Sequence, residues 1–421
     1  MLSLYRWATI MLGPVARMFL RRRASRGKED LTRLEERFGW ASIPRPQGHL
    51  VWVHAASVGE SLSVLPLVVR MLEVLPRAHI LFTTGTLTSA RLLKDRLPDQ
   101  AFHQFVPIDH PVSVRRFLDY WLPDMAIWVE SELWPNLLRE THLRNISTVL
   151  VQGRMSRKSY LHWRRVRNLI APVLKGFDRI LVQTHEDAAR FQNLGAVSPV
   201  ITGSLKYASS LLRVDEEQLR SLEHAVGSRP LWLAASIHPG EFELVCQAHL
   251  SLRPRFSDLL TIVVPRHPSS VKELVGCLKS YDLKFSQRST GGQPSRDTDV
   301  YVADTMGELG LFYRLSRQAL IGGSFIEHGG QNPLEAIQLN CAVITGPSMF
   351  NFTEVVADFN SCDASFSMAS LEEVVEKLAV LLATPELAIV LAEKQKSILA
   401  MKAGVLDLVF GSVSDFLPAT E

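Results

Sequence analysis

The most informative stretch of this sequence is GGSFIEHGGQNPLEA, which spans residues 322–336. An apolar run at 319–321 precedes it and predicts a strand, and a helix-forming pattern follows it. Its glycines let the backbone approach a ligand closely, and Asn332 followed by Pro333 is typical of a helix start, where free N–H groups attract phosphate. Glu335 could accept hydrogen bonds from the vicinal hydroxyls of a ribose. The stretch therefore indicates a nucleotide site, although glycine-rich turns without a ligand are also common in α/β proteins.

Length and composition limit the class of protein. A chain of 421 residues is long enough for two domains of ordinary size. Its 46 Lys and Arg residues nearly balance its 43 Asp and Glu residues, which does not favour a nucleic-acid-binding protein. The four cysteines form no CxxC pair, so we expect reduced thiols in a cytosolic compartment and no disulfide framework or zinc site.

The N-terminus predicts a membrane anchor over residues 1–25. Residues 2–20 are mostly apolar, and the basic run Arg21-Arg22-Arg23 follows them. The apolar run is short and impure for a spanning helix, which needs about 20 apolar residues, so a marginal span and a helix lying in the membrane interface both stay open. A third alternative is a hydrophobic first helix docked on the protein. Either membrane arrangement places the basic run at lipid headgroups and the bulk of the chain in the cytoplasm.

The rest of the chain repeats a strand–helix pattern, which predicts an α/β fold with doubly wound parallel sheets. The predicted strands are continuous apolar runs, as expected for parallel strands buried on both faces. They lie at 50–53, 79–83, 125–129, 148–151, 179–183 and 200–202, and again at 231–235, 261–264, 300–303, 319–321 and 342–345. The predicted helices between strands of the first set lie at 62–75, 87–97, 112–121, 135–143 and 186–194.

A polar segment divides this pattern into two domains. We expect a first domain at 26–208, a linker at 209–229 and a second domain at 230–421, whose last helix could pack back on the first domain. Two similar α/β domains with a nucleotide site in the second resemble the GT-B glycosyltransferases. In that fold two Rossmann-like domains face a central cleft, where donor and acceptor meet.

Acidic residues follow two predicted strands of the first domain. Ligands of open α/β sheets bind beyond the carboxyl ends of the strands, so Glu60 in HAASVGES and Glu130 and Glu132 in ESELWPN are candidate site residues. Glu60 could act as general base on an acceptor hydroxyl, or be only a favourable first-turn acid. Glu130 and Glu132 are expected to point the same way on an extended segment, where paired carboxylates can raise one another's pKa or hold cationic partners, with a solvated turn as the alternative.

Other candidates are cations and a turn. Lys206 leaves the last strand of the first domain, where its ammonium could neutralise a departing phosphate. Arg266 and His267 close a strand of the second domain and suit a phosphate or a base edge. A solvated lysine and a rigid turn are the respective alternatives. The turn at 304–309 could read a nucleobase through its backbone groups.

A metal site is not expected. Asp297-Thr298-Asp299 matches the DxD pattern by which many glycosyltransferases hold a nucleotide diphosphate through a metal ion. It precedes a predicted strand, at the amino end, away from the expected site, so we interpret it as a loop. The sequence contains no helix-spaced metal ligands of the HExxH kind, no GxSxG motif and no P-loop.

Taken together, these segments resemble the 3-deoxy-D-manno-octulosonic acid (Kdo) transferases of lipopolysaccharide biosynthesis in Gram-negative bacteria. The resemblance covers nearly the whole chain and is carried by HAASVGES, ESELWPN, GSLK, PRHP, DTMGEL, GGSFIEHGGQNPLEA and GPSMFNFTE in this order. It implies a GT-B enzyme that transfers Kdo from CMP-Kdo to a hydroxyl of the lipid A precursor, lipid IVA, with inversion. It implies no cofactor, no metal ion, and a place at the cytoplasmic face of the inner membrane.

The resemblance also implies roles for single residues. Glu60 matches the general base, and Glu130 and Lys206 match residues that support the transition state. The donor-binding candidates are Arg266, His267, Met306, Gly307, Glu308, Ser324, Asn332, Pro333, Leu334 and Glu335. The chain departs from many members at Gln331, where they have His, and at Gln152-Gly153-Arg154, where they have Asn-Ala-Arg. These departures bear on acceptor detail and leave the reaction class unchanged.

Two other functions stay open at this point. One is a different GT-B glycosyltransferase or a nucleotide-sugar epimerase that uses a UDP-sugar. The other is a membrane-tethered nucleotide-binding module without catalytic activity.

Overall fold

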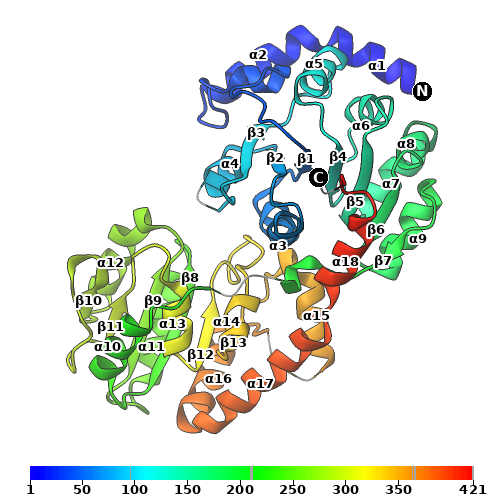
Figure 1. Cartoon of the computed structure of the whole chain (residues 1–421). Helices are drawn as coiled ribbons and strands as arrows, with labels where there is room; N and C mark the ends of the chain where they lie inside the picture. The colour runs from blue at the N-terminus through cyan, green and yellow to red at the C-terminus, as the bar shows by residue number, and fades with distance from the viewer. Residues whose placement is uncertain (95, 209–211, 363, 365–366, 420–421) are drawn as a thin grey trace. The chain divides into compact units, whose positions relative to one another are not determined.

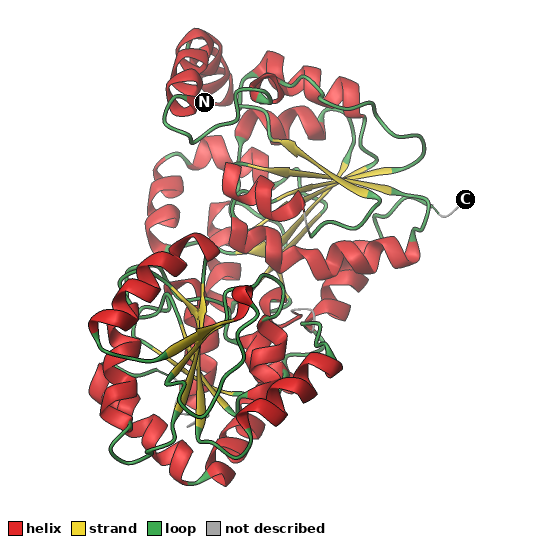
Figure 2. Ribbon diagram, turned by 90° about the vertical axis from the view of Figure 1, so that its left-hand side faces the viewer, coloured by secondary structure: helices red, strands yellow, loops and turns green. Residues whose placement is uncertain are grey.

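The chain divides into two compact units in the computed structural model, which is drawn whole in Figure 1 and describes residues 1–94, 96–208, 212–362, 364 and 367–419. The first unit comprises Met1–Ala208 together with Ala403–Glu421, and the second comprises Ser209–Lys402. Each unit has its own parallel sheet, and helices cover both faces of each sheet (Figure 2). The predicted α/β fold with parallel sheets is therefore confirmed.

The first unit is built on a seven-stranded sheet in the order β3-β2-β1-β4-β5-β6-β7. The side chains of β1 alternate between two cores, with Trp52 packing against Trp128 and Phe117 on one face and Val51 and Val53 on the other. Burial on both faces explains why the strands of this sheet are continuously apolar. The strands are β1 Leu50–His54, β2 His79–Thr84, β3 Ala101–Phe105, β4 Met125–Val129, β5 Ser147–Gly153, β6 Arg179–Val182 and β7 Val200–Ile201.

Helices connect these strands, and three helical elements precede the first strand. The C-terminal helix α18 belongs to this unit and packs against α3 and η2. The helices are α1 Leu2–Met11, α2 Gly13–Ala24, η1 Leu34–Phe38, α3 Val58–Val74, α4 Leu87–Lys94, α5 Pro111–Trp121, α6 Pro135–His142, α7 Arg157–Arg165, α8 Arg167–Leu174, α9 His185–Leu194, η2 Leu205–Ala208 and α18 Val405–Ser414.

The second unit is built on a six-stranded sheet in the order β10-β11-β9-β8-β12-β13. Its strands are β8 Leu231–Ile237, β9 Leu260–Pro265, β10 Phe285–Gln287, β11 Val300–Val302, β12 Gln318–Ile321 and β13 Ala342–Thr345. Its helices are α10 Glu216–Val226, α11 Phe242–Leu252, η3 Pro268–Ser270, α12 Val271–Ser280, η4 Arg288–Thr290, α13 Leu309–Leu315, α14 Leu334–Gln338, η5 Phe350–Phe352, α15 Thr353–Ser361, α16 Leu371–Ala383 and α17 Pro385–Met401.

Each sheet reverses its strand order at one place. In the first unit the chain moves outward from β1 to β2 and β3, and then returns to place β4 on the other side of β1. In the second unit β12 lies on the opposite side of β8 from β9. Loops diverge at such a reversal and leave a crevice beyond the strand carboxyl ends, which is where ligands of doubly wound sheets bind.

Three expectations about elements were wrong. The pattern missed β3 and β10, which lie at the edges of the two sheets and carry the mixed polar sequences AFHQF and FSQ. Edge strands are buried less completely and need no continuous apolar run. The segment expected to be a linker contains α10, which packs on α13 and belongs to the second unit; positions 209–211 of that segment lie outside the described residues.

The segment predicted to be an N-terminal anchor forms two short helices. The helices α1 and α2 have 10 and 12 residues, while about 20 residues are needed to cross the hydrocarbon core of a bilayer. No candidate span is found among the described residues of this segment.

A different segment passes a test for spanning by length and composition. It is the helical stretch Pro385–Ser414, which includes α17 and α18. Within the second unit α17 packs on α14, α16 and β13, and its buried Gln395 bonds the backbone of Val343. A packed helix with a buried amide is also what the core of a water-soluble domain contains.

Candidate active site

The first group of site residues surrounds Glu60, at the reversal point of the first sheet. Ser57 caps α3 by accepting a hydrogen bond from the Glu60 N–H at 3.3 Å, and the Glu60 carboxylate reaches back over the same turn. It accepts the Ala56 N–H at 2.7 Å and the Ser57 hydroxyl at 3.0 Å. This is a variant of the capping box, in which a first-turn acid satisfies N–H groups at a helix start. The structural alternative for Glu60 is thus partly correct, because the carboxylate does stabilise this turn.

The environment of Glu60 also gives it an unusual pKa. Burial first, and then the nearby carboxylates of Glu130 and Glu132, raise the pKa of Glu60 to about 7, against the two hydrogen bonds that favour ionisation. A carboxyl group that titrates near neutral pH can both accept a proton and release it again, which is the requirement for a general base. Both neighbouring acids come from β4, on the other side of the reversal point.

Glu130 has a strained backbone. Its φ is +58°, a left-handed conformation that costs a non-glycine residue on the order of 1 kcal/mol. The expected extended segment with Glu130 and Glu132 side by side is therefore wrong, because Glu130 and Ser131 form a turn after β4. Burial raises the pKa of Glu130, and Lys206 and Arg154 lower it. The structure thus brings Lys206 and Arg154 close to Glu130.

Glu132 packs deeper in the same turn. Its carboxylate accepts the Trp134 indole N–H at 2.7 Å and lies 4.0 Å from Nε2 of His54. Burial lowers the pKa of His54 to about 4, so this imidazole is neutral and the pair is not an ion pair. Burial also raises the pKa of Glu132, and the charge of Glu130 adds to that shift.

Gln152 is a residue of this region whose position the sequence did not reveal. It lies at the carboxyl end of β5, beside β4, with φ +59° and 1% exposure. Neither its amide nitrogen nor its amide oxygen has a hydrogen-bond partner within the described part of the chain. A buried amide without partners costs about 1–3 kcal/mol. Only its place after a predicted strand could have drawn attention to it.

The second group of site residues surrounds the glycine-rich loop after β12. The sequence predicts that a ligand approaches the backbone of this loop closely, but Glu241 occupies the N–H groups at the start of the loop. Its carboxylate accepts the N–H groups of Gly323 at 2.7 Å and of Ser324 and Phe325 at 3.0 Å each. It also accepts the His238 N–H at 3.0 Å and is 2% exposed. The N–H groups of residues 323–325 thus bind a side chain of the protein, while the phosphate contact expected at the helix start near Asn332 stays a prediction.

Two further details of the loop differ from expectation. The Ser324 hydroxyl is buried, donates to the Ile321 carbonyl and accepts the Gly346 N–H, so it supports the fold and is not open to a donor. The helix α14 begins at Leu334, one residue later than expected, and has five residues, so its dipole is small. Asn332 still caps it, with its side-chain oxygen accepting the Leu334 N–H at 3.1 Å. Pro333 and Leu334 are buried.

Glu335 lies at the start of the same helix. It is partly exposed, and its carboxylate accepts the Asn332 amide N–H at 3.1 Å. A carboxylate can accept about four hydrogen bonds, and this one is partly exposed. The geometry is thus compatible with the expected ribose contact.

Histidines gather beside this loop at the reversal point of the second sheet. The His238 ring, which follows β8, lies with its centroid 4.2 Å from that of His328 and 6.2 Å from that of His267. The amide nitrogen of Gln331 lies 2.9 Å from His238 Nε2 and donates to it. Burial first, and then His328, Arg266 and His267, lower the pKa of His238 to about 4, which keeps Nε2 an acceptor. Arg266 and His267 therefore lie at the reversal point, and Gln331 takes part through His238.

Side-chain hydrogen bonds stabilise the turn after β11. Glu308 forms two hydrogen bonds with the Arg288 guanidinium, at 2.6 and 2.5 Å, and a third with Thr305. Arg288 and Thr305 hold the pKa of Glu308 below its usual range. Both oxygens of the Glu308 carboxylate thus form hydrogen bonds within the protein. Met306 and Gly307 are exposed, and so is their backbone. Arg288 was missed, because nothing in the sequence links it to a turn some 20 residues later.

The acidic DxD segment lies away from both groups. Asp299 precedes β11, and its carboxylate accepts the Lys284 N–H at 2.8 Å. Over the described residues, no group of three or more His, Cys, Asp or Glu side chains could hold a metal ion.

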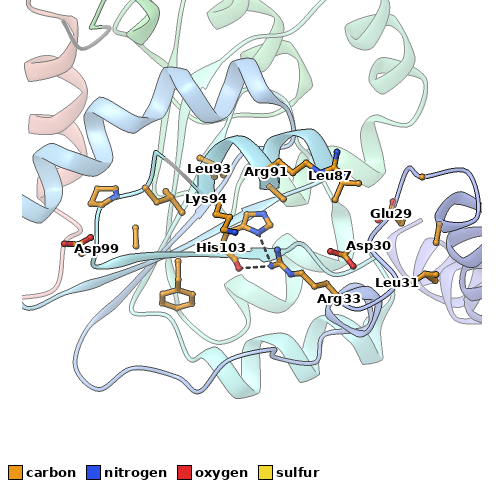
Figure 3. Close-up of a pocket in the computed structure, with 17 residues that line it drawn as sticks. Glu29, Asp30, Leu31, Arg33, Leu87, Arg91, Leu93, Lys94, Asp99 and His103 are labelled. Carbon is orange, nitrogen blue, oxygen red and sulfur yellow. Dashed lines mark hydrogen bonds between the residues drawn. The ribbon is translucent and has the colours of Figure 1, made fainter. Parts of the chain in front are cut away.

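A hollow of about 850 Å³ in the first unit contains none of the predicted site residues (Figure 3). It lies between α4, the edge strand β3 and the segment after α2. In this hollow Arg33 donates to Nδ1 of His103 at 3.1 Å and to its carbonyl at 2.9 Å, as the dashed lines show. Burial and the charges of Arg33 and Arg37 lower the pKa of His103 to about 3, so the ring is neutral. Arg33 thus covers a free edge of the sheet.

Comparisons with known proteins agree on one family. The sequence profile of the family described as 3-deoxy-D-manno-octulosonic-acid transferase matches residues 32–209. A 3-deoxy-D-manno-octulosonic acid transferase of Rickettsia bellii is 34% identical over 382 residues, which are 91% of each chain. One of Haemophilus influenzae is 37% identical over 332 residues, 77% of each chain. A probable mitochondrial one of Arabidopsis thaliana is 35% identical and covers 91% of this chain and 88% of its own.

Solved structures agree on the fold. A glycosyltransferase of Rickettsia africae has a TM-score of 0.59 at 11% identity and covers 89% of this chain and 100% of its own. A UDP-GlcNAc 2-epimerase of Neisseria meningitidis has a TM-score of 0.56 at 12% identity, with coverage of 87% and 100%. At such identities only the fold is shared, and the likeness confirms the predicted GT-B fold class.

Proposed function

This chain belongs to the 3-deoxy-D-manno-octulosonic acid (Kdo) transferase family, and we propose that it moves Kdo from CMP-Kdo to the lipid A precursor, lipid IVA. Transfer of Kdo in lipopolysaccharide biosynthesis follows from the family. The donor, the acceptor and the residues that act on them are our proposal. The observation that carries it is the carboxyl group of Glu60, which titrates near neutral pH beside Glu130 at the reversal point of the first sheet.

The proposed reaction is a single displacement with inversion. A glucosamine hydroxyl of the acceptor attacks the anomeric carbon of Kdo, and its proton passes to the Glu60 carboxylate. The bond between that carbon and the phosphate oxygen breaks, and CMP leaves with the electron pair. Lys206 stabilises the negative charge that develops on the leaving phosphate, and Glu130 holds Lys206 in place.

The second unit is proposed to hold the donor. Arg266 and His267 supply donors for the phosphate, and Glu335 accepts hydrogen bonds from the ribose. The backbone at Met306 and Gly307 reads the cytosine. A nucleoside monophosphate leaving group carries less charge than the diphosphate of most sugar donors, so side-chain cations suffice and no divalent cation is required.

The donor proposal is tested by calorimetry with CMP and UDP in buffer that contains EDTA. We expect CMP to bind and UDP to bind at least about tenfold more weakly, because the base and the number of phosphates both differ. A preference for UDP would contradict the proposal and favour an enzyme of UDP-sugars, which can share this fold.

We also propose that the enzyme docks on the cytoplasmic face of the inner membrane through α1 and α2. The support lies in which side of α1 faces the protein. Tyr5 donates to Asp109 at 2.9 Å, Arg6 to Glu140 at 2.7 Å, and the Asn136 amide to Thr9 at 3.0 Å. The polar side of the helix thus contacts the first unit, which is the reverse of an ordinary surface helix.

The apolar side of the same two helices is exposed. We call it the apolar stripe, and its members are each more than half exposed: Leu4, Trp7, Met11, Leu12, Val15, Met18 and Phe19. Most recur three or four residues apart, so they share one side. Arg21 and Arg22 continue from the stripe and suit anionic headgroups. A helix lying in the membrane interface has this composition. An enzyme whose acceptor is a membrane lipid would need such a helix to reach it.

A further inference from the structure

We propose that Glu241 is a positioning residue for the nucleotide donor, a role that rests on the proposed function. Its carboxylate takes the place that a phosphate would occupy on the glycine-rich loop, and so fixes the loop in a shape that binds the nucleotide through side chains. Glu241 itself is buried and does not contact the donor.

The contacts of Glu241 form a complete set. We call the N–H groups of His238, Gly323, Ser324 and Phe325 the N–H cradle. Oε2 accepts those of His238 and Gly323, and Oε1 accepts those of Ser324 and Phe325. Four donors converge on two oxygens, which matches the acceptor capacity of a carboxylate. A second anion has no N–H group left in the cradle and would meet a negative charge there.

The cradle joins both sides of the reversal point. His238 follows β8, and the three other members follow β12. The loop then closes on itself, with the Gly330 N–H donating to the Gly323 carbonyl at 2.8 Å and the Gln331 N–H to the Gly322 carbonyl at 3.0 Å. Gln331 in turn bonds the His238 ring. The loop backbone from Gly322 to Gln331 and the His238 ring are therefore tied to one buried carboxylate.

The cradle also explains where the donor phosphate does not bind. With its N–H groups occupied, the phosphate is left to the side chains beside the loop, namely Arg266 and the histidines 267 and 328. These residues lie around His238, whose backbone N–H is part of the cradle. Glu241 thus sets the position of the phosphate ligands and takes no part in binding it.

The chemistry of the cradle makes other residues poor replacements. A glutamine would direct its amide N–H groups at one pair of the cradle N–H groups, because only one of its two terminal atoms accepts. An aspartate is one methylene shorter and cannot keep both pairs of distances. We therefore expect Glu241→Gln and Glu241→Asp to bind CMP more weakly than the wild type, and Glu241→Ala to bind it most weakly.

The test is chemical rescue of Glu241→Ala. Removing the side chain leaves a carboxylate-sized space, so formate at millimolar concentration should enter the cradle and restore CMP binding. By calorimetry we expect a loss of affinity of about tenfold or more without formate, and recovery of most of it with formate. Formate should change nothing in the wild type or in Glu243→Ala, which removes an exposed glutamate from the same helix.

A second readout does not depend on the donor. Amide hydrogen exchange of the segment 322–332 should be slow in the wild type, fast in Glu241→Ala, and slow again with formate. If Glu241→Ala binds CMP like the wild type, or if formate restores neither binding nor protection, the role of Glu241 is contradicted. A wild type that does not bind CMP contradicts the proposed donor instead, and the exchange experiment then decides the role of Glu241. Circular dichroism of Glu241→Gln checks that the loss of binding is not loss of fold.

Discussion

Glu60 serves two purposes that conflict at the scale of a single residue. As a first-turn acid it satisfies the Ala56 N–H and holds the start of α3. As a buried carboxyl beside two others it has a pKa of about 7, so its ionised form is disfavoured in the folded protein. Shifted pKa values of this kind are common in active sites, because a catalytic residue must be able to change its charge.

The pH dependence of transfer should reveal this pKa. Below pH 7 Glu60 is protonated and cannot accept the hydroxyl proton, so kcat/KM should rise with pH and level off above an apparent pKa near 7. The Glu132 charge raises the pKa of Glu60, and Glu132→Gln removes that charge. In this variant the rise should move to lower pH. A kcat/KM that stays constant between about pH 5 and pH 8 would show that Glu60 is not the base.

Helix α1 is unusual at the scale of the element because its polar side packs inward. Its docking depends on Glu140, which is 5% exposed at its side chain. The carboxylate faces four guanidinium groups: Arg6 at 2.7 Å, Arg144 at 3.1 Å, Arg139 at 3.3 Å and Arg115 at 3.4 Å. One buried acid thus neutralises a cluster of cations that comes from three helices.

Removing that acid should cost stability. We expect Glu140→Gln to lower the free energy of unfolding by about 2 kcal/mol, because it removes the buried carboxylate that four partly exposed guanidinium groups share as an acceptor. The measurement is denaturant unfolding, with limited trypsin digestion to report release of α1. The matched control is Glu35→Gln, which breaks the exposed pair with Arg17 and should cost less than about 1 kcal/mol. Equal effects of the two substitutions would contradict the importance of the buried cluster.

The apolar stripe can be tested in the same element. Trp7→Ser with Met11→Ser should weaken binding to vesicles of phosphatidylethanolamine and phosphatidylglycerol by about tenfold or more, since two large apolar side chains no longer leave water. Sedimentation with vesicles measures this. The control is Val380→Ser with Leu387→Ser, two exposed apolar residues of the second unit. If the two double variants bind vesicles equally well, the docking surface lies elsewhere.

Acid should affect the two units differently at the scale of the whole molecule. In the second unit His249 and His238 have pKa values lowered to about 4, so the unfolded chain binds more protons and stability falls as the pH drops from about 6.5 towards 4. In the first unit His54, His103 and His142 act in the same direction. There they are opposed by carboxyls whose pKa values are raised, and these gain stability on protonation: Glu60, Asp109, Glu130 and Glu132.

We therefore expect the second unit to lose its structure first on acidification. Each histidine whose pKa is lowered in the folded state removes about 1.4 kcal/mol of stability per pH unit, over the pH range between its unfolded and folded pKa values. Hydrogen exchange at pH 7 and pH 4.5 measures the effect, with β8 and β9 reporting on one unit and β1 and β4 on the other. Loss of protection in β1 and β4 first would contradict this assignment of charges.

The sequence predicted most of the fold because buried parallel strands are continuously apolar. It missed β3 and β10, since edge strands need no such run. It identified Glu60 from its place after a strand, but the pKa of Glu60 depends on residues that lie about 70 positions away and meet it only across the sheet reversal. Glu241 was missed for the same reason, because three of the four N–H groups of its cradle lie 82 to 84 residues further along the chain.

The central claim is that this chain transfers Kdo with Glu60 as the base. Mass spectrometry of lipid IVA after incubation with the enzyme and freshly supplied CMP-Kdo tests it most directly, with wild type and Glu60→Gln compared at equal concentration. We predict a lipid heavier by at least one Kdo with the wild type. With Glu60→Gln, which should still bind CMP, we predict unchanged lipid. An unchanged lipid with the wild type, or equal amounts of product with both enzymes, would contradict the account.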